Sequence, residues 1–155
     1  MSATASCTFQ PIGHVRTDVA DADVPRRRRD IVSTIEVLPR FAEALLGIEA
    51  YSHLFVLFWM DRAAPSAALT CHPRGNPEIP LTGVLAARGR NHPNPIGLAV
   101  VELLEVHGNR LRVRCLDAYD GTPVIDLKPY DDYDRVETPR VPAWFSARAR
   151  RPVDG

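Results

Sequence analysis

The pattern of hydrophobic and polar positions predicts short strands separated by turns, because the apolar segments are brief and 14 prolines and nine glycines divide them. Residues 31–38 are rich in β-branched side chains, which favours a strand. Residues 53–59 are apolar at almost every position, which indicates a strand covered on both sides or a stave of a barrel. Further strands are expected at 82–87, 98–107, 110–115 and 123–128.

Two local signals complete this pattern. Between residues 110 and 115, apolar Leu111, Val113 and Cys115 alternate with arginines, and the preceding Gly108 and Asn109 suit a tight turn, so a hairpin with one solvated face is expected. Residues 39–46 begin with a proline and precede a glycine, which predicts one short helix. The predicted fold class is therefore all-β, mainly an antiparallel β-barrel, with a short helix and irregular termini.

The length of 155 residues fits one domain with its own hydrophobic core. The expected organisation is a flexible N-terminus at residues 1–8, a β-barrel domain at 9–145 and a basic C-terminal tail at 146–155. No apolar run approaches the roughly 20 residues of a membrane span. The first residues lack the basic and apolar regions of a secretion signal, so we expect a cytoplasmic protein without a membrane partner.

Charge and cysteine content narrow the function classes. The 19 basic and 19 acidic residues balance, which disfavours a domain whose whole surface holds nucleic acid. Basic residues nevertheless concentrate in the run from Arg26 to Arg29 and again near the C-terminus. The three cysteines are scattered and odd in number, and no histidine stands at metal-ligand spacing, so reduced thiols and no metal site are expected.

The first candidate site is the segment 88–98. Its two prolines restrain the backbone on both sides of Asn94, and we expect Gly89 and Gly97 to permit unusual backbone conformations. A loop held in this way can present main-chain donors and acceptors to a ligand such as an adenine ring. The alternative interpretation is a tight connection between two barrel strands.

The second candidate site is the segment 120–130, in which Asp126 and Lys128 fall on one face of a strand. They could form a supporting ion pair, or they could line a pocket where the carboxylate attracts a cation and the lysine a carboxylate. Tyr130 could offer a stacking surface. A third segment, 47–54, contains Ser52 and His53, and this histidine is interpreted as structural because no catalytic triad accompanies it.

These segments, in this order, resemble the TsaA/TrmO family of tRNA methyltransferases over roughly residues 9–144. The most specific motifs are Pro93-Asn-Pro-Ile-Gly-Leu98 and Asp120-Gly-Thr-Pro-Val-Ile-Asp-Leu-Lys-Pro-Tyr130. The resemblance implies a small β-barrel that binds S-adenosylmethionine near a homodimer interface. In the characterised branch, the methyl acceptor is the exocyclic nitrogen of threonylcarbamoyl-adenosine beside the anticodon of threonine tRNA.

The resemblance also assigns roles to residues. The cofactor-binding set that it implies is Arg88, Arg90, Pro93, Asn94, Pro95, Ile96, Gly97, Leu98, Asp126 and Lys128. The substrate-binding set combines Arg74, Lys128 and Tyr130, which the resemblance implies, with Arg26 and Arg27 of the basic run, which would contact the phosphate backbone of tRNA. This chain departs from the family around residues 88–92 and at Met60-Asp61, positions that bear on the substrate more than on the cofactor.

The expected chemistry is an in-line transfer of an activated methyl group, in which the protein aligns the acceptor with the donor. The attacking nitrogen must lose a proton, and Asp126, Tyr130 or His92 could accept it. Besides tRNA methylation, two alternatives remain open. One is a methyltransferase of the same fold acting on a small metabolite, and the other is a non-catalytic S-adenosylmethionine-binding module.

Overall fold

The structure is a computed structural model that describes residues 6–64 and 66–149. Contacts between Cα atoms divide the chain into two compact units. Of the described residues, the first unit comprises 6–64, 66 and 90–130, and the second comprises 67–89 and 131–149. Within the described part of the chain, no helix combines the length and apolar character that crossing a membrane requires.

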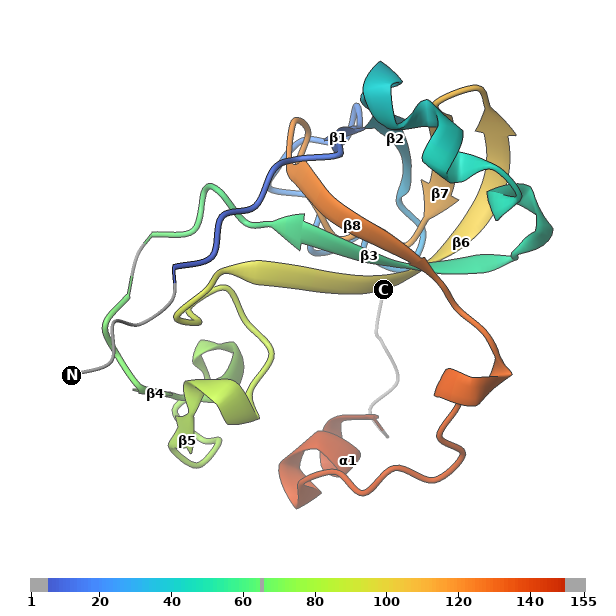
Figure 1. Cartoon of the computed structure of the whole chain (residues 1–155). Coiled ribbons are helices and arrows are strands. Elements are labelled where there is room, and N and C mark those ends of the chain that lie inside the picture. Colours follow the sequence, from blue (N-terminus) through green and yellow to red (C-terminus); the bar gives the residue numbers. More distant parts are fainter. Residues whose placement is uncertain (1–5, 65, 150–155) are drawn as a thin grey trace. The chain divides into compact units, whose positions relative to one another are not determined.

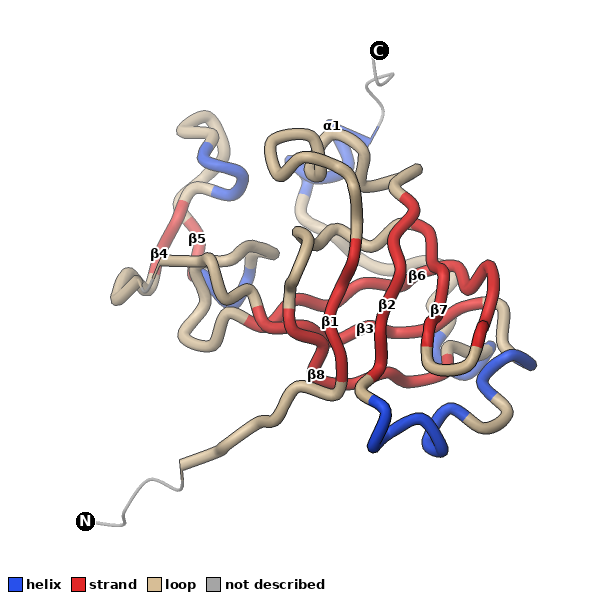
Figure 2. The backbone as a smooth tube through the Cα atoms, turned by 90° about the horizontal axis from the view of Figure 1, so that it is seen from above, coloured by secondary structure: helices blue, strands red, loops and turns tan. Residues whose placement is uncertain are grey.

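The first unit is a closed barrel of antiparallel strands, which confirms the predicted fold class (Figures 1 and 2). Around the barrel the strands run in the order β1 (Gly13–Arg16), β2 (Val32–Val37), β7 (Arg110–Arg114), β6 (Ile96–His107), β3 (His53–Trp59) and β8 (Pro123–Pro129). The strands expected at 31–38, 53–59 and 123–128 are confirmed within one or two residues, as is the hairpin formed by β6 and β7.

The barrel interior is filled by alternate side chains from every strand, as the two-residue period of β-structure requires. On β3, Leu54, Val56 and Phe58 point inward and are buried, whereas the residues between them are half-buried on the outside. On β7, Leu111 and Val113 also point inward and are fully buried. The apolar run at 53–59 therefore belongs to a barrel stave whose outer face is also largely apolar.

One 3₁₀ helix, η1 (Pro39–Leu45), occupies the position of the predicted helix and buries Leu45. The chain leaves this helix through Gly47, whose φ of 86° lies in the left-handed region that glycine tolerates best. A second short 3₁₀ helix, η2 (Ile48–Ala50), then leads to β3. The proline and glycine at the two ends of this segment therefore correctly predicted a helix, which is of the tighter 3₁₀ type.

A β-bulge in β8 decides which residues of that strand face outward. Leu57 on β3 pairs with Asp126, whereas the next residue, Phe58, pairs with Val124, so Ile125 has no partner in this register. Val124 is fully buried in the barrel. Because the bulge adds one residue, Asp126 lies on the outer face beside Leu57, and the alternation resumes from there.

The second unit contains the short strands β4 (Thr70–Cys71) and β5 (Thr82–Gly83), the helix α1 (Ala143–Ala149), and three 3₁₀ turns. The turns are η3 (Pro73–Gly75), η4 (Val84–Ala86) and η5 (Asp132–Asp134). The strand expected at 82–87 is wrong beyond Gly83. There the amide of Ala87 donates to the carbonyl of Val84 at 3.3 Å, so the chain turns instead of extending, and Val84 is buried.

Candidate cofactor and substrate site

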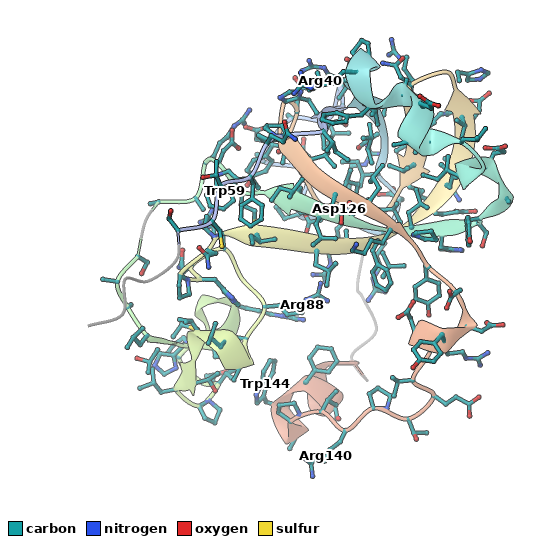
Figure 3. The ribbon with its side chains drawn as sticks, viewed as in Figure 1. Arg40, Trp59, Arg88, Asp126, Arg140 and Trp144 are labelled. Atoms are coloured by element: carbon teal, nitrogen blue, oxygen red, sulfur yellow. The ribbon has the colours of Figure 1, made fainter. Side chains whose placement is uncertain are left out.

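The outer face of three neighbouring strands, β6, β3 and β8, brings together the two motifs that the sequence singled out. Leu57 on β3 pairs with Leu98 on β6 and with Asp126 on β8. Two residues earlier on β3, Phe55 pairs with Val100 on β6 and with Lys128 on β8. The loop motif and the strand motif therefore meet across β3, with its outward side chains between them. We call this three-strand surface the outer face; Figure 3 labels Asp126 on β8 and Trp59 at the end of β3.

The β6 part of the outer face is apolar and accessible. Ile96, Leu98 and Val100 alternate along the strand and are 36%, 50% and 45% exposed. Three exposed apolar side chains in one row are a concentration that soluble proteins use for binding a ligand or a partner. Ile96 and Leu98, both predicted cofactor-binding residues, thus present their side chains to the outside of the barrel.

The β8 part of the outer face is polar. Lys128 Nζ lies 3.0 Å from Asp126 Oδ2, and Asp126 Oδ1 accepts a hydrogen bond from the Leu127 amide at 2.9 Å. The predicted placement of the two side chains on one face is confirmed. Both are well exposed, and an ion pair of this kind contributes about 0–1 kcal/mol. Ligand charges can therefore replace either partner at little cost.

Tyr130 lies at the end of this face against two aromatic rings. Its ring packs edge-on to Phe55, with centroids 5.4 Å apart, and to His53 at 6.3 Å. His53 Nδ1 is 2.9 Å from the Ser52 hydroxyl, which orients the imidazole. Sequence reasoning interpreted His53 as structural only, because its closeness to Tyr130 depends on the register between β3 and β8.

The segment 88–98 holds its shape through main-chain hydrogen bonds. The Asn94 carbonyl accepts from the Ile96 amide at 2.8 Å, and the Pro95 carbonyl accepts from the Met60 amide at 2.8 Å. Gly89 and Gly97 do not use the left-handed conformations that glycine permits, since neither has a positive φ. Gly97 is instead buried against the ring of Phe58, its partner on β3.

Other predicted residues lie elsewhere. In the barrel unit, Arg90, Pro93 and Asn94 are exposed in the approach to β6, and His92 there is half-buried. In the second unit, Arg88 is exposed after η4, and the Arg74 guanidinium lies 5.9 Å from the centre of the Phe145 ring. Arg26 and Arg27 lie in the loop between β1 and β2 and belong to none of the three strands of the outer face.

A hollow lies at the end of β3, where β6 begins. It has a volume of about 340 Å³ and is lined by residues 7–11 with Trp59, Pro123 and Ile125. Trp59 pairs with Ile96, so the hollow adjoins the apolar row of the outer face. Its volume falls in the lower part of the range of small-molecule sites, and an indole wall suits a flat ring.

The remaining barrel wall is occupied by paired charges. Glu36 on β2 contacts Arg16 and Arg110, and Glu102 on β6 contacts Arg114. These pairs neutralise one another and leave this wall less suited to a charged ligand. Among residues 6–64 and 66–149, no group of three His, Cys, Asp or Glu side chains is placed to hold a metal ion.

Glu105 on β6 completes this wall. Its carboxylate lies 2.6 Å from His107 Nε2 and 3.8 Å from Arg112. The hydrogen bond with His107, followed by the charge of His107, lowers the pKa of Glu105 below its ordinary value of 4.5.

The sequence is similar to one known protein family and to two proteins of Archaeoglobus fulgidus. The family described as "tRNA-methyltransferase O N-terminal domain" matches residues 19–135. An S-adenosyl-L-methionine-binding protein of Archaeoglobus fulgidus is 46% identical over 125 residues, covering 79% of this chain and 88% of the relative. A second A. fulgidus protein, described as a probable S-adenosyl-L-methionine-binding protein, is 48% identical over 112 residues, which are 72% of this chain but 30% of the relative.

Solved structures extend the comparison to the fold. A crystal structure of TrmO from P. aeruginosa superposes with a TM-score of 0.73 at 32% identity, over 93% of this chain and 64% of that one. The chain thus spans less than two thirds of this solved relative and of one of the A. fulgidus relatives.

The chain therefore has the β-barrel fold of this solved relative. It belongs to the tRNA-methyltransferase O N-terminal domain family. This confirms the family predicted from the two long motifs, and it supports the predicted cofactor and the predicted type of enzyme.

Proposed function

We propose that this chain is an S-adenosylmethionine-dependent methyltransferase that N-methylates threonylcarbamoyl-adenosine beside the anticodon of tRNA, acting as a homodimer in the cytoplasm. The observation that carries this proposal is the outer face. There the apolar row of Ile96 and Leu98 lies across one strand from the exposed pair of Asp126 and Lys128. The Asp126 carboxylate and the Lys128 ammonium form a weak ion pair that a ligand can replace. Together with the apolar row, they suit a ligand that is apolar at one end and zwitterionic at the other.

The chemistry of these side chains fits the cofactor. The Asp126 carboxylate would attract its positive sulfonium or amino group, and Lys128 would meet its carboxylate. Ile96, Leu98 and the neighbouring indole of Trp59 would cover the adenine ring. The remaining predicted cofactor residues, Arg88, Arg90, Pro93, Asn94, Pro95 and Gly97, would shape the main chain around it.

In the proposed reaction, bound S-adenosylmethionine supplies a methyl group that is already activated for displacement. The residues of the chain hold the acceptor nitrogen in line with it and keep water away, which the apolar side chains of Phe55 and Leu57 favour. The nitrogen loses a proton as it attacks. Asp126, Tyr130 and His92 are the proposed acceptors of that proton, and Lys128 lies 3.0 Å from the carboxylate of Asp126.

The proposed tRNA contacts are Arg74, Lys128, Tyr130 and the arginine run that begins with Arg26 and Arg27. The proposed dimer rests on the exposed row of Ile96, Leu98 and Val100, since a second copy of the chain would remove these side chains from water. A dimer through this surface would also enclose the open side of the proposed cofactor site, which a single barrel leaves accessible.

Methylation of a defined tRNA tests the proposal. The purified chain is incubated with S-adenosylmethionine and threonine tRNA that carries threonylcarbamoyl-adenosine, and the nucleosides are analysed by mass spectrometry. One added methyl group on that nucleoside is expected, and none on tRNA that lacks the threonylcarbamoyl group. Calorimetry with S-adenosylmethionine alone measures cofactor binding separately.

A matched pair of variants locates the site. Asp126→Asn removes the charge from the outer face and should weaken cofactor binding at least tenfold, which corresponds to about 1.4 kcal/mol. Asp132→Asn removes an equivalent exposed charge from η5 and should leave binding unchanged. Equal binding by both variants would contradict the proposed place of the cofactor, and binding without methylation of any tRNA would favour another acceptor.

A further inference from the structure

The loop between β1 and β2 has an ordered backbone built from successive turns. The amides of Arg26 and Arg27 donate to the Asp23 carbonyl at 3.1 and 3.0 Å. The amides of Asp30 and Ile31 donate to the Arg27 carbonyl at 2.9 and 2.8 Å. These bonds enclose the arginine run 26–29, so the four side chains project from a folded turn. We call residues 20–31 the arginine turn.

Two apolar side chains of the arginine turn are fully buried. Val24 and Ile31 have no exposed surface. Near the end of the turn, the Cys115 thiol donates to the Arg29 carbonyl at 3.0 Å, and the Cys115 amide donates to the Ile31 carbonyl at 2.9 Å.

Arg62, in the segment after β3, provides a further attachment. Its guanidinium forms an ion pair with Asp21, donates to the Asp120 carbonyl at 2.9 Å and lies 5.4 Å from the centre of the Tyr119 ring. The arginine turn is thus held in place before any ligand arrives, which reduces the entropy lost on binding.

The four arginines of the turn differ in what their guanidinium groups contact. Arg26 lies 4.0 Å from Asp23, and Arg27 lies 3.6 Å from Asp30, so each faces a carboxylate of the turn itself. For Arg28 and Arg29, no side-chain ion pair or hydrogen bond is found with any residue that the structure describes. Both are exposed.

The acidic residues of the turn do not cancel this charge. Asp23 and Asp30 are engaged by Arg26 and Arg27, and Asp21 is engaged by Arg62. Two adjacent guanidinium groups that pair with no carboxylate of the described residues form a local positive site on a chain of zero net charge. Guanidinium is the side-chain group best matched to phosphate oxygens.

We propose that Arg28 and Arg29 are the residues of this turn that contact the phosphate backbone of RNA, whereas Arg26 and Arg27 serve mainly to hold the turn together. This inference rests on the proposed function, because it takes tRNA as the partner. It transfers the RNA contact from the pair expected from the sequence to its neighbours, because Asp23 and Asp30 partly offset the positive charge that a phosphate would meet at Arg26 and Arg27.

Two double variants of equal charge provide the test. The first combines Arg28→Ala with Arg29→Ala, and the second combines Arg26→Ala with Arg27→Ala. The affinity of each for threonine tRNA is measured by fluorescence anisotropy between low and moderate salt. Each phosphate contact that is lost should reduce the slope of log affinity against log salt concentration by about 0.7–0.9, so the first variant should lose about 1.4–1.8.

The expected result is a flatter salt dependence and weaker binding for the first variant, with a smaller change in slope for the second. A third variant, Arg28→Lys with Arg29→Lys, should keep most of the slope because the charge remains. Thermal melting checks that all three variants are folded. An unchanged slope in the first variant, or equal losses in the first two, overturns the proposal.

The same measurements separate this inference from the proposed function. If the unmodified chain methylates tRNA while the first variant binds tRNA as the unmodified chain does, the proposed function stands and the phosphate contact is wrong. If the unmodified chain has no salt-dependent affinity for tRNA, the phosphate contact and the tRNA acceptor are both wrong. Calorimetry with S-adenosylmethionine then shows whether the proposed cofactor remains.

Discussion

The ring of Phe58 occupies the space that a side chain on Gly97 would need. A Cβ atom built on Gly97 would lie 2.2 Å from two ring carbons, and Phe58 is itself buried in the barrel core. The two residues are cross-strand partners on β3 and β6. The glycine in the middle of the proposed cofactor loop is therefore required by the packing of an aromatic ring.

Gly97→Ala is accordingly expected to destabilise the protein by about 1–3 kcal/mol, the usual cost of overpacking a filled core. Urea denaturation measures this loss. Gly89→Ala is the matched control, because a Cβ there meets no atom within 4 Å and the backbone has no positive φ. Its stability should be unchanged or slightly raised, and a similar loss in both variants would contradict the role assigned to Phe58.

Cys115→Gly is expected to raise the free energy of unfolding by up to about 1 kcal/mol. Cys115 has a φ of 74°, a left-handed conformation that costs a non-glycine residue about 1–2 kcal/mol. This gain should exceed the loss of the weak thiol hydrogen bond and the added freedom of glycine in the unfolded chain. Cys71→Gly, at a strand position without positive φ, should lower stability by about 0.5–1 kcal/mol. A loss in both variants would argue against strain at Cys115.

The carboxyl group of Glu105 should titrate below its ordinary value of 4.5, and His107→Ala should move its pKa back toward that value. NMR titration of the side-chain carboxyl measures both. Because the folded-state pKa is lowered, the stabilisation that Glu105 provides is present above about pH 4.5 and is lost as the pH falls through the lowered pKa. An identical midpoint with and without His107 would exclude the hydrogen bond as the cause.

Leu98→Asp should convert the proposed dimer into a monomer, because it places a charge in the centre of the apolar row on β6. Light scattering measures the mass in solution. Leu85→Asp is the control, since Leu85 is 78% exposed on the turn η4 of the second unit and should leave the assembly intact. If the unmodified chain is itself a monomer at micromolar concentration, the dimer is wrong.

Sequence patterns predicted those parts of the fold whose cause is local. The β-branched run at 31–38 became β2, and the turn at Gly108 joined β6 and β7, with φ of 59° at the glycine. The spacing of Asp126 and Lys128 correctly placed them on one face. The segment 82–87 failed because its short apolar pattern fits a strand and a buried turn equally well, and burial of Val84 favoured the turn.

Features that depend on partners distant in the sequence were not predictable. The need for glycine at position 97 depends on Phe58, which is fixed by the register between β3 and β6. His53 joins the candidate site only because β8 places Tyr130 beside it. The different contacts of the arginines in the arginine turn likewise depend on turns that bring Asp23 and Asp30 within reach of two of them.

The bulge at Ile125 makes the site depend on the register of β8 as well as on the identity of its residues. If Ile125 paired with Leu57 in a regular ladder, Asp126 would pair with Val56 and point into the barrel. Burial of a carboxylate there, with Lys128 following it inward, would cost several kcal/mol. Deleting Ile125 would instead leave Asp126 opposite Leu57, because the pairs of Val124 with Phe58 and of Asp126 with Leu57 would then be consecutive. Natural relatives that lack the bulge residue should therefore keep this carboxylate on the outer face.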